Sequence, residues 1–130
     1  MTPDLMYVAW TAVLLVVLWI PYILGSLITS GFLTPQEYST PLEREHPPWL
    51  RRCNRAHVNL VENFAPFAAL LLIAHVTDQA NATTAMAAAV FFWARVAHAI
   101  GYIMGLPYVR TLLFSIGFVA TLVIAWEVIR

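Results

Sequence analysis

The chain contains no lysine, a single cysteine and few charged residues of any kind. Arginine supplies all of the basic charge, and seven arginines balance seven acids, so the formal net charge is zero. Such a balance excludes the basic surface of a nucleic-acid-binding protein. Because Cys53 has no second thiol to pair with, the chain forms no internal disulfide and no metal cluster with thiolate ligands.

Apolar residues take the place of the missing charge, since 61% of the 130 residues are hydrophobic and 11% are charged. A soluble domain of this length could not bury so much apolar surface, because small domains bury only part of their chain. Apolar runs long enough to cross a hydrocarbon core of about 30 Å recur along the sequence. The expected helices cover residues 5–29, 49–76, 84–104 and 108–130. The sequence therefore predicts an all-α integral membrane four-helix bundle with up-down topology, as one transmembrane domain over residues 1–130.

Residues 30–48 are the one substantial loop that the sequence predicts, because prolines interrupt it and acids require water. Four of the arginines lie in this loop and in the first turns of the helix that follows it: Arg44, Arg51, Arg52 and Arg55. The positive-inside rule then places the loop in the cytoplasm. By analogy with other short, lysine-free chains, we expect a multi-pass protein of the bacterial inner membrane.

One stretch of the second expected helix carries polar residues into the membrane. At 100° per residue its polar positions fall within an arc of about 80° on one face. They are Arg51, Arg55, Asn59 and Glu62, with Pro66 on the same face. Charge at this depth is costly and is normally directed toward protein or water. This face is therefore a candidate functional surface.

The up-down topology predicts further polar residues at the same depth. Arg95, His98 and Tyr102 share one face of the third expected helix, at positions i, i+3 and i+7. Arg110 and Thr111 open the fourth helix on the same side of the membrane. In the opposite half of the membrane we expect almost no polar side chain except His75, near the end of its helix.

Two interpretations of this cluster differ in its charge balance. One is a buried ion network, for example between Glu62 and Arg95, that fixes the register of the helices. The other is a ligand site, because Arg55, Arg95 and Arg110 outnumber the single carboxylate and leave about two positive charges without a partner. The surplus favours an anionic ligand.

The order of these residues resembles the MAPEG family, the membrane-associated proteins in eicosanoid and glutathione metabolism. The resemblance covers the whole chain, and its most specific part is the segment Arg55-Ala56-x-x-Asn59-x-x-Glu62. Arg95, His98 and Tyr102, followed by Pro107 and Arg110-Thr111, continue it.

The resemblance implies a homotrimer that binds glutathione between subunits and acts on lipophilic electrophiles as a transferase or peroxidase. It assigns Arg110 to the thiol as a catalytic residue, and the hydroxyl of Thr111 beside it is a candidate hydrogen-bond donor to the sulfur. The residues that it implies for glutathione binding are Arg55, Asn59, Glu62, Arg95, His98 and Tyr102. Residues 26–34 lack the arginine that catalytic members often carry there, and Phe114 stands where some have tyrosine. The alternative is thus a non-catalytic MAPEG-like protein that binds a lipid or an anion, or scaffolds a partner.

Overall fold

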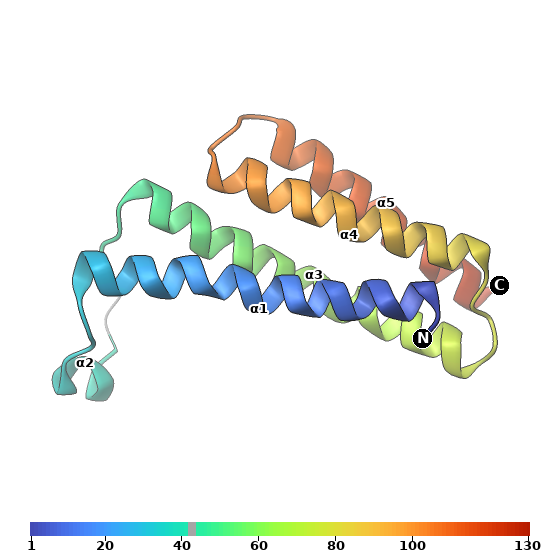
Figure 1. Cartoon of the computed structure of the whole chain (residues 1–130), viewed down its shortest axis with the longest axis horizontal. Coiled ribbons are helices and arrows are strands. Elements are labelled where there is room, and N and C mark those ends of the chain that lie inside the picture. The colour runs from blue at the N-terminus through green and yellow to red at the C-terminus, as the bar shows by residue number, and fades with distance from the viewer. Residues whose placement is uncertain (42–43) are drawn as a thin grey trace.

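Four long helices make up most of the computed structural model, which describes residues 1–41 and 44–130. They are α1 (Pro3–Ser30), α3 (Pro48–Val76), α4 (Ala82–Ile103) and α5 (Val109–Ile129). Each is long and apolar enough to cross a membrane, and together they form a bundle (Figure 1). The prediction of an all-α bundle of four membrane-spanning helices is confirmed, and the chain is an integral, multi-pass membrane protein.

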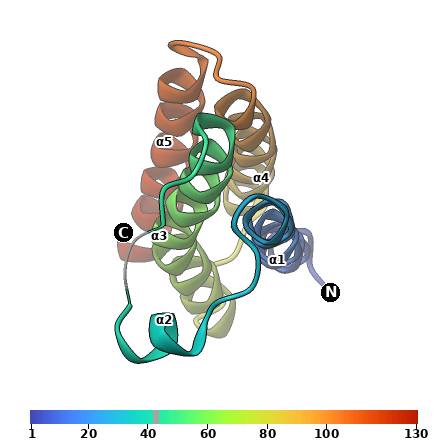
Figure 2. The same cartoon turned by 90° about the vertical axis from the view of Figure 1, so that its left-hand side faces the viewer.

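The helices lie along the long axis of the molecule, and both termini are at one end (Figure 1). We call that end, with the turn between α3 and α4, the turn end. The other end, with residues 31–41 and 44–47 and the turn between α4 and α5, is the loop end (Figure 2). Helix α4 contacts α1, α3 and α5, whereas α1 and α5 do not touch in the part of the chain that the structure describes. Helix α3 likewise contacts α1, α4 and α5, so α3 and α4 together form the centre of the bundle.

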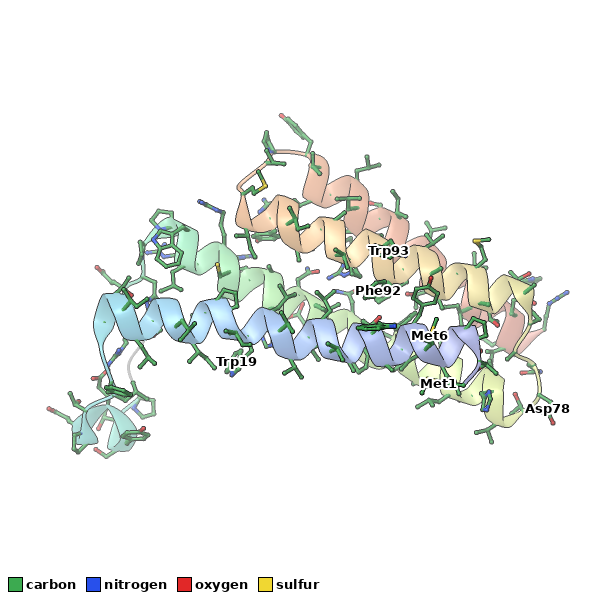
Figure 3. All side chains as sticks on the ribbon, in the orientation of Figure 1. Met1, Met6, Trp19, Asp78, Phe92 and Trp93 are labelled. Atoms are coloured by element: carbon green, nitrogen blue, oxygen red, sulfur yellow. The ribbon has the colours of Figure 1, made fainter. Side chains whose placement is uncertain are left out.

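Small residues on α4 allow the neighbouring helices to approach. Ala87 and Ala88 are buried, and the Phe91 ring stacks on Phe67 of α3 with centroids 3.9 Å apart. In a membrane, where lipid is as apolar as the core, such close packing drives helix association. Larger apolar side chains are left to the outer surface, where Trp93 is 60% exposed (Figure 3).

Helix α1 joins the bundle along a seam of buried residues spaced seven apart: Asp4, Thr11, Leu18 and Gly25. A spacing of seven keeps one side of a helix against its partner. A glycine is required at position 25 because α1 and α3 lie close together there: a Cβ atom would lie 2.6 Å from Leu50 Cδ1 on α3. The two helices are therefore closely fitted at Gly25.

The turn end is more polar inside than the sequence predicted. The sequence predicts almost nothing polar there except His75, but Asp4 is 2% exposed and Thr84 is fully buried, whereas His75 itself is exposed. Asp4 is buried because it lies on the seam of α1. Asp78 lies at the same end (Figure 3).

Asn81 caps α4 at the turn end. Its Oδ1 accepts hydrogen bonds from the backbone N–H groups of Thr83 and Thr84 at 2.8 and 3.1 Å, and its amide donates to Glu127 on α5 at 2.6 Å. We expect Asn81→Ala to lower the free energy of unfolding by about 1–2 kcal/mol, because it removes both the cap and the link to α5. Denaturant titration in detergent micelles measures this. Thr83→Ala is the matched control, and an equal loss in both variants would contradict the capping role.

A short helix, α2 (Pro35–Ser39), lies within the segment predicted as a loop. Thr34 and Glu37 form a capping box at its start. Glu37 also receives two hydrogen bonds from the Arg44 guanidinium, at 2.7 and 2.9 Å. The same guanidinium donates to the backbone carbonyls of Gly31 and Phe32 just beyond α1, at 2.8 and 3.0 Å. Arg44 therefore ties α2 to the end of α1.

The Arg44–Glu37 pair has a defined pH dependence. Hydrogen bonds from Arg44 lower the pKa of Glu37 from 4.5 to about 2. Because the folded-state pKa lies below the ordinary value, the pair stabilises the loop fully above about pH 4.5 and loses this effect as the pH falls toward 2. NMR titration of the Glu37 carboxyl should give a midpoint near 2. In Arg44→Gln the midpoint should move back toward 4.5, and an unchanged midpoint would contradict the assignment.

Candidate functional site

Tyr102, near the loop end of α4, is the centre of a group of cationic side chains. The Arg55 Nε atom on α3 donates a hydrogen bond to the Tyr102 hydroxyl at 2.9 Å. The Arg110 guanidinium, from the first turn of α5, lies 4.8 Å from the centroid of the Tyr102 ring. His98 packs edge-on against the same ring, one turn deeper, at 5.7 Å. Three helices thus meet around one phenol.

Arg95 lies about 10 Å deeper on the same face of α4, at a rise of 1.5 Å per residue. It is 2% exposed, and its Nη2 atom donates to Oδ1 of Asn59 on α3. The Phe91 and Phe114 rings flank the guanidinium, with centroids 6.0 and 5.7 Å away. The buried Nε atom has no hydrogen-bond partner among the described residues. A full positive charge therefore lies inside the bundle with a neutral acceptor.

The other predicted site residues face outward. Glu62 and Thr111 are exposed, and so are Arg55 and Arg110 apart from their contacts with Tyr102. The ion pairs within residues 1–41 and 44–130 are Arg44–Glu37 and Arg130–Glu127. The ion pair between Glu62 and Arg95, considered above as a purely structural network, is not formed.

Sequence reasoning missed the structural part played by Arg52. Its Nε atom donates to the backbone carbonyl of Ile103 at 3.0 Å, and its side chain packs against Gly105. Gly105 has a φ of 73°, which favours glycine and ends α4. The last carbonyls of a helix lack partners within it. The end of α4 could therefore have suggested that an arginine donates to its free carbonyls. Only the fold shows that Arg52 is the arginine close enough to do so.

The chemistry of this arrangement is that of an anion site. Arg55, Arg95 and Arg110 carry guanidinium groups, and none of them is paired with a carboxylate among the described residues. Guanidinium groups bind carboxylates and phosphates through charge-assisted hydrogen bonds. Asn59, His98 and Tyr102 add neutral donors and acceptors. The site can hold a polar anion at the edge of an apolar environment.

Comparison with known proteins agrees with this description. The chain is 34% identical over 82 residues to microsomal glutathione S-transferase 1 of Mus musculus, which covers 62% of this chain and 53% of that protein. The rat and bovine proteins of the same name are each 33% identical over 82 residues. The chain thus spans about half the length of the curated relatives that it matches. The sequence profile of the MAPEG family matches residues 5–130, so the chain belongs to the MAPEG family.

Proposed function

We propose that this chain is a membrane-embedded glutathione transferase or peroxidase that acts on lipophilic electrophiles. The observation that carries the proposal is the group of three guanidinium groups around Tyr102 and Asn59 without a carboxylate partner. The name of its relatives, microsomal glutathione S-transferase 1, supports glutathione as the anion.

Glutathione matches the charges available. Its two carboxylates require cations, which Arg55 and Arg95 supply, and its ammonium requires an acid, which Glu62 supplies. Asn59, His98 and Tyr102 then line the peptide. Arg110 and Thr111, at the first turn of α5, are left for the thiol. In this assignment every ionised group of the tripeptide meets a group of opposite charge.

The thiol must lose its proton before it can attack an electrophile. Lowering a thiol pKa by about two units takes roughly 2.7 kcal/mol. One cation about 4 Å away supplies roughly 4 kcal/mol at an effective dielectric constant of 20. Arg110 alone is therefore sufficient to keep the sulfur ionised, and the Thr111 hydroxyl can donate a hydrogen bond to it.

The site is completed by further copies of the chain. Arg55 and Glu62 are exposed on α3, although they lie within a membrane-spanning helix. Charges at such a depth are directed toward protein or water rather than lipid. A homotrimer in which α3 faces the neighbouring subunit covers this surface, with the loop end on the cytoplasmic side and electrophiles entering from the bilayer.

The test is the ultraviolet absorbance of the thiolate in purified protein mixed with glutathione in detergent. A thiolate signal at neutral pH that saturates with glutathione supports the enzyme. Saturable binding without a thiolate would favour the non-catalytic, anion-binding alternative. Absence of binding would remove glutathione from the proposal altogether.

A further inference from the structure

A second polar region lies at the loop end, next to Arg55. It is a cleft of about 960 Å³ between the last turns of α1, the segment before α3 and the first turns of α3. Its polar lining comprises Tyr22, Ser26, Arg44, Glu45, His46, Arg51 and Asn54. Arg55 lies at its inner edge and is shared with the site proposed above. The remaining residues take no part in that site.

The basic groups of the cleft differ in how far they are already paired. Arg44 is neutralised by Glu37 and holds the carbonyls beyond α1, so its part is structural. Arg51 is exposed, and its Nε atom donates to the backbone carbonyl of His46 at 3.1 Å. Its two terminal nitrogens donate no hydrogen bond to the described residues. Arg51 is thus oriented by its neighbour while most of its donors stay available.

His46 provides a second observation. Its ring packs edge-on against Tyr22 of α1 at 5.8 Å, which fixes it in the wall of the cleft. Its Nδ1 atom is buried and has no hydrogen-bond partner among the described residues. A buried polar atom without a partner is costly. His46 itself is half-buried and lines the cleft, so the accessible part of its ring can meet a ligand there.

The lining changes from polar to apolar along α1. Ile23, Leu27 and Leu33 form the apolar part, and Ile23 and Leu33 are 37% and 48% exposed. A small soluble anion would leave these side chains in water. The cleft also lies where membrane-spanning helices end, at the depth of lipid headgroups. Basic pockets between such helices bind anionic headgroups.

We propose that this cleft binds an anionic phospholipid, with its phosphate at Arg51 and His46 and its glycerol and upper acyl chain along Ile23 and Leu27. The acid in the cleft lining, Glu45, is exposed, so its charge is screened by water. The phosphate is held by the available guanidinium donors, and the apolar wall selects a lipid over a free anion. Arg51 and His46 take no part in the proposed glutathione site, although Arg55 lines both.

Native mass spectrometry of the detergent-solubilised protein tests the assignment with phosphatidylglycerol and with phosphatidylcholine of the same acyl chains. We expect the wild type to bind phosphatidylglycerol at least about tenfold more tightly, because a charge-assisted hydrogen bond distinguishes the two headgroups. Arg51→Gln should lose about tenfold in affinity for phosphatidylglycerol, and Arg51→Lys, which keeps the charge, should lose less. Arg130→Gln, at the turn end, is the matched control and should bind like the wild type.

Several results would overturn the proposal. Equal affinity for the two lipids would show that the headgroup charge is not recognised. Full binding by Arg51→Gln, with helix content unchanged by circular dichroism, would place the lipid elsewhere. Displacement of phosphatidylglycerol by millimolar inorganic phosphate would assign the cleft to a free anion, and displacement by glutathione would assign it to the co-substrate.

Discussion

Replacing Arg110 with alanine is expected to abolish the thiolate absorbance of bound glutathione and to lower the rate of conjugation by about 10²–10³. The guanidinium of Arg110 lies over the Tyr102 ring at the first turn of α5, and its nitrogens are not engaged by a carboxylate among the described residues. It is therefore available to a developing anion. Without it, the sulfur keeps its proton at neutral pH and loses its nucleophilicity.

The measurement combines thiolate absorbance with the rate of conjugation of glutathione to a lipophilic aryl halide. Glutathione binding, measured by calorimetry, should weaken far less than the rate, because Arg55 and Arg95 hold the carboxylates in the proposed site. Arg130→Ala removes an arginine from the far end of the same helix and serves as the control. Retention of the thiolate in Arg110→Ala would assign the activating cation to another residue.

The Asn59–Arg95 contact is expected to give the largest change in stability. Asn59→Leu leaves the Arg95 guanidinium buried without its hydrogen-bond acceptor, and we expect the free energy of unfolding to fall by about 2–3 kcal/mol. Arg95→Met in the same background removes the charge as well. Because an apolar pair costs less than an orphaned charge, the double variant should recover much of the loss.

A double-mutant cycle in denaturant titrations measures this coupling, which we expect to be about 1.5–3 kcal/mol. Asn63→Leu is the control one turn away, since its amide donates at 2.7 Å to the backbone carbonyl of Asn59 rather than to a charge. Its replacement should cost about 1 kcal/mol. Additive effects of Asn59→Leu and Arg95→Met would show that the two residues are not coupled.

The membrane fold could be predicted because length and hydropathy alone determine which segments cross a bilayer. Prolines marked the long loop, but α2 within it was missed. Its capping box, Thr34 with Glu37, was present in the sequence, yet the segment is only five residues long. What holds it in place is Arg44, which reaches carbonyls more than ten residues earlier. Such a contact depends on the path of the chain, which local patterns do not give.

For the candidate site, the sequence could predict which residues share one face of a helix. The spacing of Arg95, His98 and Tyr102 predicted a common face, and all three are buried on it. The pairing of Arg95 with Asn59 rather than Glu62 was not predictable, because it depends on the register between α3 and α4. That register is set by side-chain packing, such as the stacking of Phe67 on Phe91. The assignment of these residues to glutathione stays a prediction.

The heptad seam of α1 has a consequence for how this helix can vary. Many of its other positions are exposed on the outer surface, where one apolar side chain can replace another at little cost, although Tyr7, Val8, Leu14 and Leu15 pack against the core beside the seam. A single insertion between Thr11 and Leu18 would instead turn the rest of the helix by about 100°. Gly25 would then leave the side chain of Leu50, and a bulkier neighbour would collide with it. Natural variants of α1 should thus tolerate amino-acid substitutions more often than insertions or deletions.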